Sequence, residues 1–221
     1  MIEKMKKSVY SIVLSDDVVR EVDKLAYKLN TNRSGMINEI LAEYLSMITP
    51  ESRIRQIIHS LENAISESTS FKILPSSTDA TFTVKSALSY KYNPVIKYSV
   101  ALYKNNKNHF GCIKAGIRTQ NETLISVMNE FFLIFYKIET KFIEFPDNLY
   151  HEIGGGRLTR NFKVGTDYRI DDNIMGASIS NYINNLDKMI KYYFDNSENP
   201  YLINNLEKIY KDYLNNAGII L

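Results

Sequence analysis

The amino-acid sequence predicts an α+β protein in two parts, and three observations support this assignment. A short β-branched run near the N-terminus is followed by two helical patterns, three β-rich segments come after them, and long amphipathic patterns fill most of the second half. We therefore expect a small module over residues 1–49, a connecting helix and linker over residues 50–70, and an α+β domain over residues 71–221. In that domain an antiparallel sheet of three or more strands is covered by helices.

The N-terminal module begins with one predicted strand over residues 8–14, which is rich in β-branched and aromatic residues. The strand ends at Ser15-Asp16-Asp17, which favours a helix start because acidic residues stabilise the first helical turn. Apolar residues at three- and four-residue steps predict a first helix from Asp16 to about Leu29. After Asn30-Thr31-Asn32, a second helix capped by Asn32 is expected as far as Thr49-Pro50.

The larger domain is predicted from alternation and helical periodicity. In Thr81–Tyr92 apolar residues alternate with polar ones, which is typical of a strand with one buried face and one wet face. Two more strands are expected over Val95–Tyr103 and His109–Thr119, with a hairpin loop over residues 104–108. The other expected elements are a connecting helix over residues 51–66, a helix over Asn121 to about Ile143, an irregular stretch over residues 146–170, and helices over about Asp172–Asp195 and Pro200–Ala217, with Pro200 at a first helical position.

The small module cannot bury a core alone, because roughly 45 residues is near the lower limit for independent folding. A two-fold solution pairs residues 8–14 with their copy from a second chain, as an antiparallel ribbon above the interlocked helices of both chains. Alternate strand residues then separate, with Val9, Ser11 and Val13 pointing outward. A two-stranded ribbon fits the major groove of DNA, so the outward residues would contact the bases. The shared dimer core would contain Tyr10, Ile12, Leu14, Val18, Val22, Leu25, Leu29, Ile37, Ile40, Leu41 and Tyr44.

Residues 7–45 resemble the ribbon-helix-helix family of bacterial DNA-binding proteins. The resemblance rests on the strand ending in Leu14, the polar helix start, the heptad-like Val18–Leu29, the turn Asn30-Thr31-Asn32-Arg33-Ser34 and the helical segment Met36–Leu41. It implies a homodimer that holds the DNA backbone through the start of its second helix, where free amides and the helix dipole meet a phosphate. The matching positions are Asn32, Arg33 and Ser34, and Lys4, Lys6 and Lys7 would add a flexible basic arm.

Two features depart from the family pattern. Base-contacting positions in the family are commonly polar or basic, yet Val9 and Val13 can touch thymine methyl groups but form no hydrogen bonds with bases. In addition, the basic and acidic residues of the module balance, so it has no net charge. Either recognition is indirect and AT-biased, through groove shape, or the module is retained only as a dimerisation unit.

Composition excludes several classes of protein. The net charge of +2 is too mild to indicate nucleic acid by itself, and the single cysteine, Cys112, excludes intrachain disulfides and fits a reducing compartment. Ser8–Leu14 is too short and too polar for a signal peptide, and no run approaches the roughly 20 apolar residues of a membrane span. We therefore expect a cytoplasmic, nucleoid-associated protein with no membrane partner.

No arrangement of catalytic residues stands out, so we expect neither an enzyme nor a cofactor. His59, His109 and His151 lack metal-ligand spacing, and Cys112 is expected to be an inert buried thiol. Gly154-Gly155-Gly156-Arg157 could cradle an anion with help from Arg160 and Lys163, although a flexible loop before a strand is the simpler interpretation. The tyrosines at helical spacing predict core or interface positions: Tyr192, Tyr193, Tyr210 and Tyr213.

Three functions remain open from the sequence. The first is a sequence-specific transcriptional regulator, such as a repressor, whose larger domain senses a ligand, binds a protein or pairs dimers along double-stranded DNA. The second is a plasmid or phage partition protein or a DNA-transfer accessory protein. The third is an antitoxin, which the well-patterned remainder of the chain disfavours because such antitoxins usually carry a short disordered tail.

Overall fold

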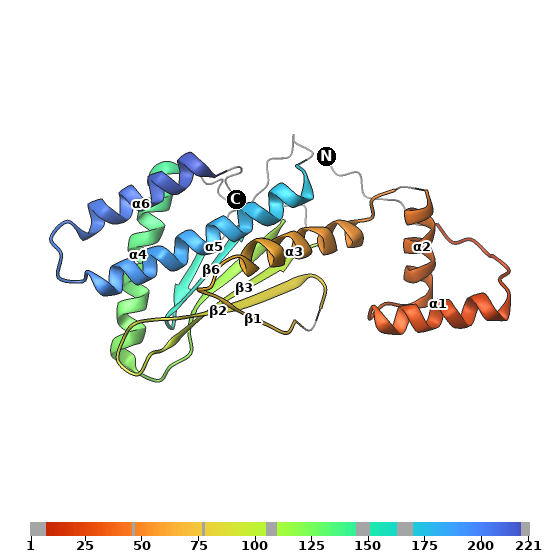
Figure 1. The fold of residues 1–221 in the computed structure, drawn as a ribbon, viewed down its shortest axis with the longest axis horizontal. Helices are drawn as coiled ribbons and strands as arrows, with labels where there is room; N and C mark the ends of the chain where they lie inside the picture. Colours follow the sequence, from red (N-terminus) through yellow and green to blue (C-terminus); the bar gives the residue numbers. More distant parts are fainter. Residues whose placement is uncertain are drawn as a thin grey trace.

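The computed structural model describes residues 8–45, 47–76, 78–104, 110–144, 151–162 and 170–217. In these ranges the chain forms six helices and one six-stranded antiparallel sheet, which confirms the predicted α+β class (Figure 1). The helices are α1 (Asp16–Lys28), α2 (Arg33–Tyr44), α3 (Pro50–Ser66), α4 (Glu122–Phe142), α5 (Asp172–Asp195) and α6 (Leu202–Asn216). The strands are β1 (Lys72–Leu74), β2 (Thr81–Ala87), β3 (Val95–Leu102), β4 (Gly111–Ile117), β5 (His151–Gly154) and β6 (Arg157–Phe162).

The sheet has the strand order β1-β2-β3-β4-β6-β5, and every neighbouring pair is antiparallel. β2, β3 and β4 form the predicted meander, although the loop predicted over residues 104–108 lies almost wholly outside the described residues. The strand predicted over Thr81–Tyr92 is wrong in its second half, because it ends at Ala87. Tyr92 and Asn93 adopt φ values of 68° and 45°, and the Asn93 amide donates to the Tyr90 carbonyl, so the chain turns there toward β3.

The irregular stretch predicted over residues 146–170 is wrong over residues 151–162, which form the hairpin of β5 and β6, while residues 146–150 and 163–169 lie outside the described residues. Its two-residue turn is Gly155-Gly156, with φ values of 60° and 71°. A tight hairpin turn of the primed type needs positive φ at both central residues, which glycine adopts without a steric penalty. The glycine run therefore closes a hairpin at the edge of the sheet.

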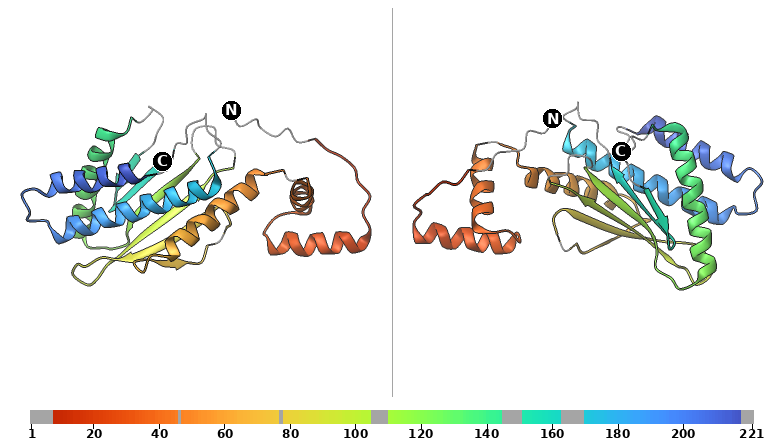
Figure 2. Two further views of the ribbon diagram at one scale, coloured as in Figure 1. Left: turned by 45° about the horizontal axis from the view of Figure 1, so that its top comes forward. Right: turned by 180° about the vertical axis from the view of Figure 1, so that it is seen from behind.

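α3 and α5 lie side by side over one face of the sheet, whereas α1 and α2 stand apart from the sheet (Figure 2). α3 is more than the connecting helix expected from the sequence, because it packs along α5 and buries Ile57 and Leu61 completely. Gly176 of α5 permits this contact, since an added Cβ would lie 2.6 Å from the Ser60 Cβ and 2.7 Å from the Ile57 carbonyl oxygen. α4 contacts β5 and β6, and α6 packs against α5 and α4. None of the helices in the described ranges combines the length and the apolarity that a membrane crossing requires.

α4 and α5 agree closely with their predicted bounds, and each is capped by a side chain at its N-terminus. Asn121 accepts from the Leu124 amide, and Asp171 accepts from the amides of Asn173 and Ile174. α6 differs slightly, because Pro200 lies in a turn and the helix begins at Leu202. The Leu202 amide donates to the Asn199 carbonyl, so that turn precedes the first helical residue.

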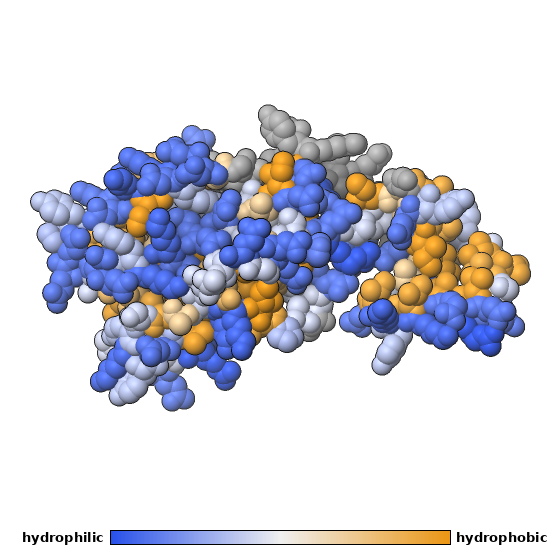
Figure 3. Space-filling model, in the orientation of Figure 1, coloured by the Kyte–Doolittle hydropathy of each residue, from blue (hydrophilic) through white to orange (hydrophobic). Residues whose placement is uncertain are grey.

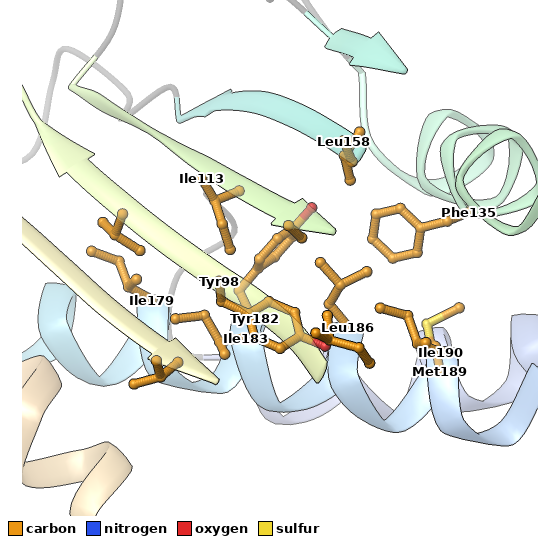
Figure 4. Packing of buried hydrophobic residues seen from close by; sticks show 14 of the residues in the cluster. Tyr98, Ile113, Phe135, Leu158, Ile179, Tyr182, Ile183, Leu186, Met189 and Ile190 are labelled. Carbon is orange, nitrogen blue, oxygen red and sulfur yellow. The ribbon is translucent and has the colours of Figure 1, made fainter. Parts of the chain in front are cut away.

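The core lies between the sheet and the helix layer. Figure 4 shows Tyr98, Ile113 and Leu158 from three strands facing α5 and α4 residues such as Ile183 and Phe135. The stripe of tyrosines is partly core, as predicted, with Tyr193 and Tyr210 buried. Cys112 is buried, also as predicted, and its sulfur accepts from the Tyr103 hydroxyl at 3.0 Å. That hydrogen bond, together with burial, raises the pKa of Tyr103 to about 12.

A fully buried carboxylate joins five elements at one end of the core. Glu139 of α4 lies 3.0 Å from the Arg160 guanidinium of β6 and 3.3 Å from the His151 imidazole of β5. Its Oε1 also accepts from the Tyr182 hydroxyl of α5 at 3.1 Å and from the Tyr210 hydroxyl of α6 at 3.3 Å. The Arg160 side chain also lies 4.8 Å from the Tyr182 ring, a cation–π contact.

These contacts keep Glu139 charged in spite of its burial. Burial by itself would raise the pKa of Glu139, but Arg160, His151 and Tyr182 together hold that pKa below its ordinary value. The pKa of Arg160 is raised, because attraction to Glu139 outweighs burial, which would lower it. Both groups therefore stay ionised, and removing either one would leave the other charge buried without its main partner.

We expect Glu139→Gln to lower the free energy of unfolding by about 3 kcal/mol or more, because it leaves the Arg160 charge buried. Chemical denaturation at neutral pH measures this. The contribution should be present above the ordinary glutamate pKa of about 4.3 and should be lost as the pH falls through the lowered pKa. Glu122→Gln, at an exposed position of the same helix, is the control and should cost less than about 1 kcal/mol. Equal losses in the two variants would contradict the structural role of Glu139.

Candidate nucleic-acid interface

The segment expected to form the DNA-contacting ribbon is not a strand in the single chain. Residues 8–15 have no regular secondary structure, so a ribbon-helix-helix module is not shown by one copy of the protein. A strand satisfies its backbone amides and carbonyls only beside another strand. The predicted partner is a second chain, and the single chain supplies this segment and the two helices that follow it.

Exposure along this segment alternates in the manner expected of a ribbon with one inward face. Val9 and Val13 are fully exposed, whereas Tyr10 is 83% exposed, Ile12 57% and Leu14 36%. Ile12 and Leu14 are among the residues assigned to the dimer core, and Val9 and Val13 are among those assigned to base contacts. The two groups therefore differ in exposure even without a partner chain.

The two helices of the module bury very little between them. α1 and α2 share a core of Val22, Ala26 and Met36, with Leu29 and Ile37 packed against it. Figure 3 shows apolar side chains gathered on the surface of this part of the molecule. Most of the predicted dimer-core residues are exposed in the single chain: Tyr10, Ile12, Leu14, Val18, Leu25, Ile40, Leu41 and Tyr44. An apolar surface of this extent is typical of an interface with another protein chain.

The start of α2 has the geometry expected of an anion-binding helix terminus. Asn32 is the N-cap, and its side chain accepts from the Gly35 amide at 2.8 Å, as predicted. An added Cβ at Gly35 would lie 2.7 Å from the Thr31 hydroxyl, so glycine leaves room for this cap. Arg33 and Ser34, both exposed, are the first two residues of the helix, and their amides lie outside the intrahelical hydrogen-bond ladder.

Arg33 already has an intramolecular partner. Its Nε and Nη2 donate to the two carboxylate oxygens of Asp23 in α1, at 2.7 Å and 2.6 Å. The hydrogen bond from Arg33 lowers the pKa of Asp23, and the pair is exposed to solvent. An interaction of Arg33 with a DNA phosphate would therefore compete with, or share, this ion pair, which links the start of α2 to the middle of α1.

The other predicted anion sites are placed differently. Lys4, Lys6 and Lys7 lie outside the described residues, as does Lys163. The Gly156 amide donates to the Asn129 side chain at 2.9 Å, so one of the amides expected to cradle an anion is already used. The structure also separates Arg160 from the glycine turn, because this side chain points into the core toward Glu139.

The two histidines that the structure describes, His59 and His151, do not converge on a metal site. Within the described residues no group of three or more His, Cys, Asp and Glu side chains is arranged to hold a metal ion. His59 contacts Asn63 one turn away on α3, and His151 contacts Glu139 in the buried cluster. His109 lies outside the described residues.

The pairing of two lysines, Lys85 of β2 and Lys97 of β3, was not predicted from the sequence. Lys85 and Lys97 alternate with buried residues along their strands, so their exposure was predictable from the period of two. Their position directly opposite each other depends on the strand register, which the sequence pattern does not reveal.

We expect Asn32→Ala to weaken the start of α2 by about 1 kcal/mol, because it removes the side-chain acceptor of the Gly35 amide. Hydrogen exchange measured by mass spectrometry on peptides covering the first turn of α2 would show faster exchange. Asn38→Ala, at an exposed position inside the same helix, is the matched control and should leave exchange equal or slower, because alanine favours helix. Faster exchange in the control as well would show that the cap is not the cause.

Comparison with known proteins adds no identification. The chain matches no family model, and neither the curated proteins nor the solved structures contain a match to it. The function must therefore be inferred from the geometry of the chain itself.

Proposed function

We propose that this protein is a homodimeric, sequence-specific DNA-binding regulator of transcription, associated with the nucleoid, that inserts a two-stranded ribbon into the major groove. The observation that carries the proposal is the exposed apolar surface of the N-terminal module. A segment without regular secondary structure precedes two helices that bury only a small core, and apolar side chains remain exposed on all three. This order of elements resembles the ribbon-helix-helix family, in which a second chain covers such a surface.

A second copy of the chain would provide hydrogen-bond partners for residues 8–14 and would cover the exposed apolar side chains of the module. Pairing residues 8–14 with their copy fills the hydrogen bonds of this segment. The same arrangement covers Ile12, Leu14, Leu25 and Leu41, whose exposure to water is unfavourable by about 25 cal/mol for each Å² of apolar surface. Folding of the module and dimerisation are therefore coupled.

The dimer presents the groups that a DNA duplex needs. The outward side of the ribbon carries Val9, Ser11 and Val13, which are small enough to enter the major groove and can contact thymine methyl groups. The free amides at the start of α2 face a phosphate, supported by the helix dipole. Base discrimination by two valines is weak, so AT-biased groove shape contributes to specificity.

The larger domain is connected closely to the module, which suits a regulator whose second domain senses an effector or pairs dimers along DNA. Only residues 45–49 separate α2 from α3, and Thr49 caps α3 by accepting from the Ser52 amide. Arg55 of α3 donates to Glu39 of α2 at 2.9 Å, a half-buried ion pair. A change in the position of α3 would therefore be transmitted to α2.

We expect the wild-type protein to have twice the chain mass in sedimentation equilibrium, and Ile12→Asp to dissociate it. The carboxylate would be placed in the shared core, where an unpaired charge is not tolerated. Val13→Asp is the matched control, since it makes the same substitution one residue away on the outward face and should keep the dimer. A wild-type monomer, or equal dissociation of both variants, would contradict the proposed ribbon.

We expect the protein to bind the DNA upstream of its own gene more tightly than an unrelated duplex, measured by fluorescence anisotropy at several salt concentrations. Arg33→Ala should weaken binding and make the salt dependence shallower, by about 0.9 in slope for each phosphate that the variant no longer neutralises. Substituting Lys4, Lys6 and Lys7 by alanine together should have the same kind of effect.

Asp23→Asn is the matched control for Arg33, because it breaks the same ion pair but keeps the guanidinium. It should leave DNA affinity unchanged or higher if Arg33 contacts phosphate. Equal weakening by Asp23→Asn and Arg33→Ala would show that the ion pair acts only on the fold. Equal, weak binding to both duplexes, indifferent to every variant, would mean that the module serves dimerisation alone.

A further inference from the structure

The sheet has one covered face and one open face. α3 and α5 lie on the covered face, and in the view from behind the strands stand in front of these two helices (Figure 2). The burial pattern agrees, since Ile96, Tyr98 and Val100 of β3 are buried while the alternate residue Lys97 is exposed. Among the described residues no helix crosses the middle of the open face.

The open face carries a row of basic residues across neighbouring strands. Lys72 of β1 pairs with Lys85 of β2, and Lys85 pairs with Lys97 of β3. The row continues through Gly116 of β4 to Arg157 of β6. Next to it, a second row contributes Thr83, Ser99, Lys114 and Thr159. The face therefore combines five cations with hydroxyl groups.

These cations have no carboxylate partners on the sheet. Within the described residues none of the five is in an ion pair, and the acid of the second row, Glu152, lies on the outer strand β5. Like charges directly opposite each other on neighbouring strands destabilise a sheet. The excess of cations on this face exceeds the net charge of +2, so the rest of the chain is net negative.

Protection of a sheet edge does not explain the row. Lysines on edge strands commonly prevent pairing with other proteins, and Lys72 on β1 fits that role. Lys85 and Lys97 lie on β2 and β3, which are paired on both sides. Edge protection therefore does not account for the repulsion between Lys85 and Lys97. A bound polyanion would offset this repulsion.

We propose that the open face of the sheet is a second contact surface for double-stranded DNA, which holds the phosphate backbone independently of sequence. This inference rests on the proposed DNA-binding function and extends it to the larger domain. The row from β1 to β6 spans about 19 Å, from a strand spacing of about 4.8 Å. Each strand of a duplex presents one phosphate per about 3.4 Å of its axis, so several phosphates lie within reach of the row.

The chemistry of the face favours a duplex over a single strand. Proteins that bind single-stranded nucleic acid generally stack the bases on aromatic side chains. The exposed and half-buried outward positions of β2, β3, β4 and β6 carry no aromatic residue: they are Thr81, Thr83, Lys85, Ala87, Val95, Lys97, Ser99, Ala101, Lys114, Arg157, Thr159 and Asn161. The other two outward positions of β4, Cys112 and Gly116, are buried, and Cys112 contacts Tyr103, which lies one residue beyond β3. Lysine, arginine, serine, threonine and asparagine side chains are common donors to duplex phosphates.

The test compares two triple variants of the full-length protein that remove the same charge. Lys85→Gln/Lys97→Gln/Lys114→Gln changes the open face, and Lys137→Gln/Lys188→Gln/Lys208→Gln changes exposed positions on α4, α5 and α6. Binding to the upstream duplex, an unrelated duplex and a single-stranded oligonucleotide is measured at several salt concentrations. The open-face variant should lose about tenfold or more in affinity for both duplexes, and its salt slope should fall by about 0.9 for each phosphate that it no longer neutralises. The control should change much less.

Two further readouts separate this proposal from the proposed function. The ratio of affinities for upstream and unrelated DNA should not change in the open-face variant, because the ribbon provides specificity. Its thermal midpoint should be equal or higher, because like-charge repulsion is removed.

The outcomes distinguish the two proposals. If the protein prefers upstream DNA but the two triple variants bind DNA with equal affinity, the open face is not a DNA contact surface, and the proposed role of the ribbon is retained. A larger loss for the single strand than for the duplexes would overturn the duplex assignment. Duplex binding without preference, abolished only in the open-face variant, would support the open face and overturn specific recognition by the ribbon.

Discussion

The larger domain depends on one buried carboxylate. Glu139 connects α4 to β5, β6, α5 and α6 through contacts with His151, Arg160, Tyr182 and Tyr210. An ion pair of this kind stabilises little compared with apolar packing, but it strongly disfavours arrangements in which either charge loses its partner. The register of the β5–β6 hairpin and the position of α6 are therefore constrained together. The hairpin cannot slide by two residues without withdrawing Arg160 from Glu139.

The N-terminal module differs from the larger domain, because its own core is very small. A large domain with a complete core is attached to two helices that share three buried residues. The short connection through Thr49 and the ion pair between Glu39 and Arg55 hold the module beside α3 but leave apolar residues such as Ile12 and Leu41 exposed. In the proposed dimer, the second copy would cover these residues without changing the core of the larger domain.

Local patterns predicted much of this structure, and long-range pairing accounts for the rest. The bounds of α4 and α5 and the meander of β2 to β4 follow from periodicity, caps and alternation, which act within a few residues. The β5–β6 hairpin was missed because its strands are short and rich in polar residues. Arg160 was assigned to a surface loop because charge usually indicates exposure, and only its pairing with Glu139 reverses that. Asn32 was predicted as a cap, but the ion pair of Arg33 with Asp23 depends on how α1 and α2 meet.

The distribution of charge explains how a neutral, valine-rich ribbon can serve a DNA-binding protein. Residues 1–49 carry equal numbers of basic and acidic side chains, so the module contributes little long-range attraction to a duplex. In the proposed arrangement the open face of the sheet would supply that attraction, because electrostatic binding to phosphates depends on the number of cations and hardly on the sequence. Shape-dependent contacts of Val9 and Val13 then need only to distinguish sites among duplexes that are already bound. The proposed arrangement therefore places affinity and specificity in different parts of the chain, and we expect the salt dependence of DNA binding to come mainly from the larger domain.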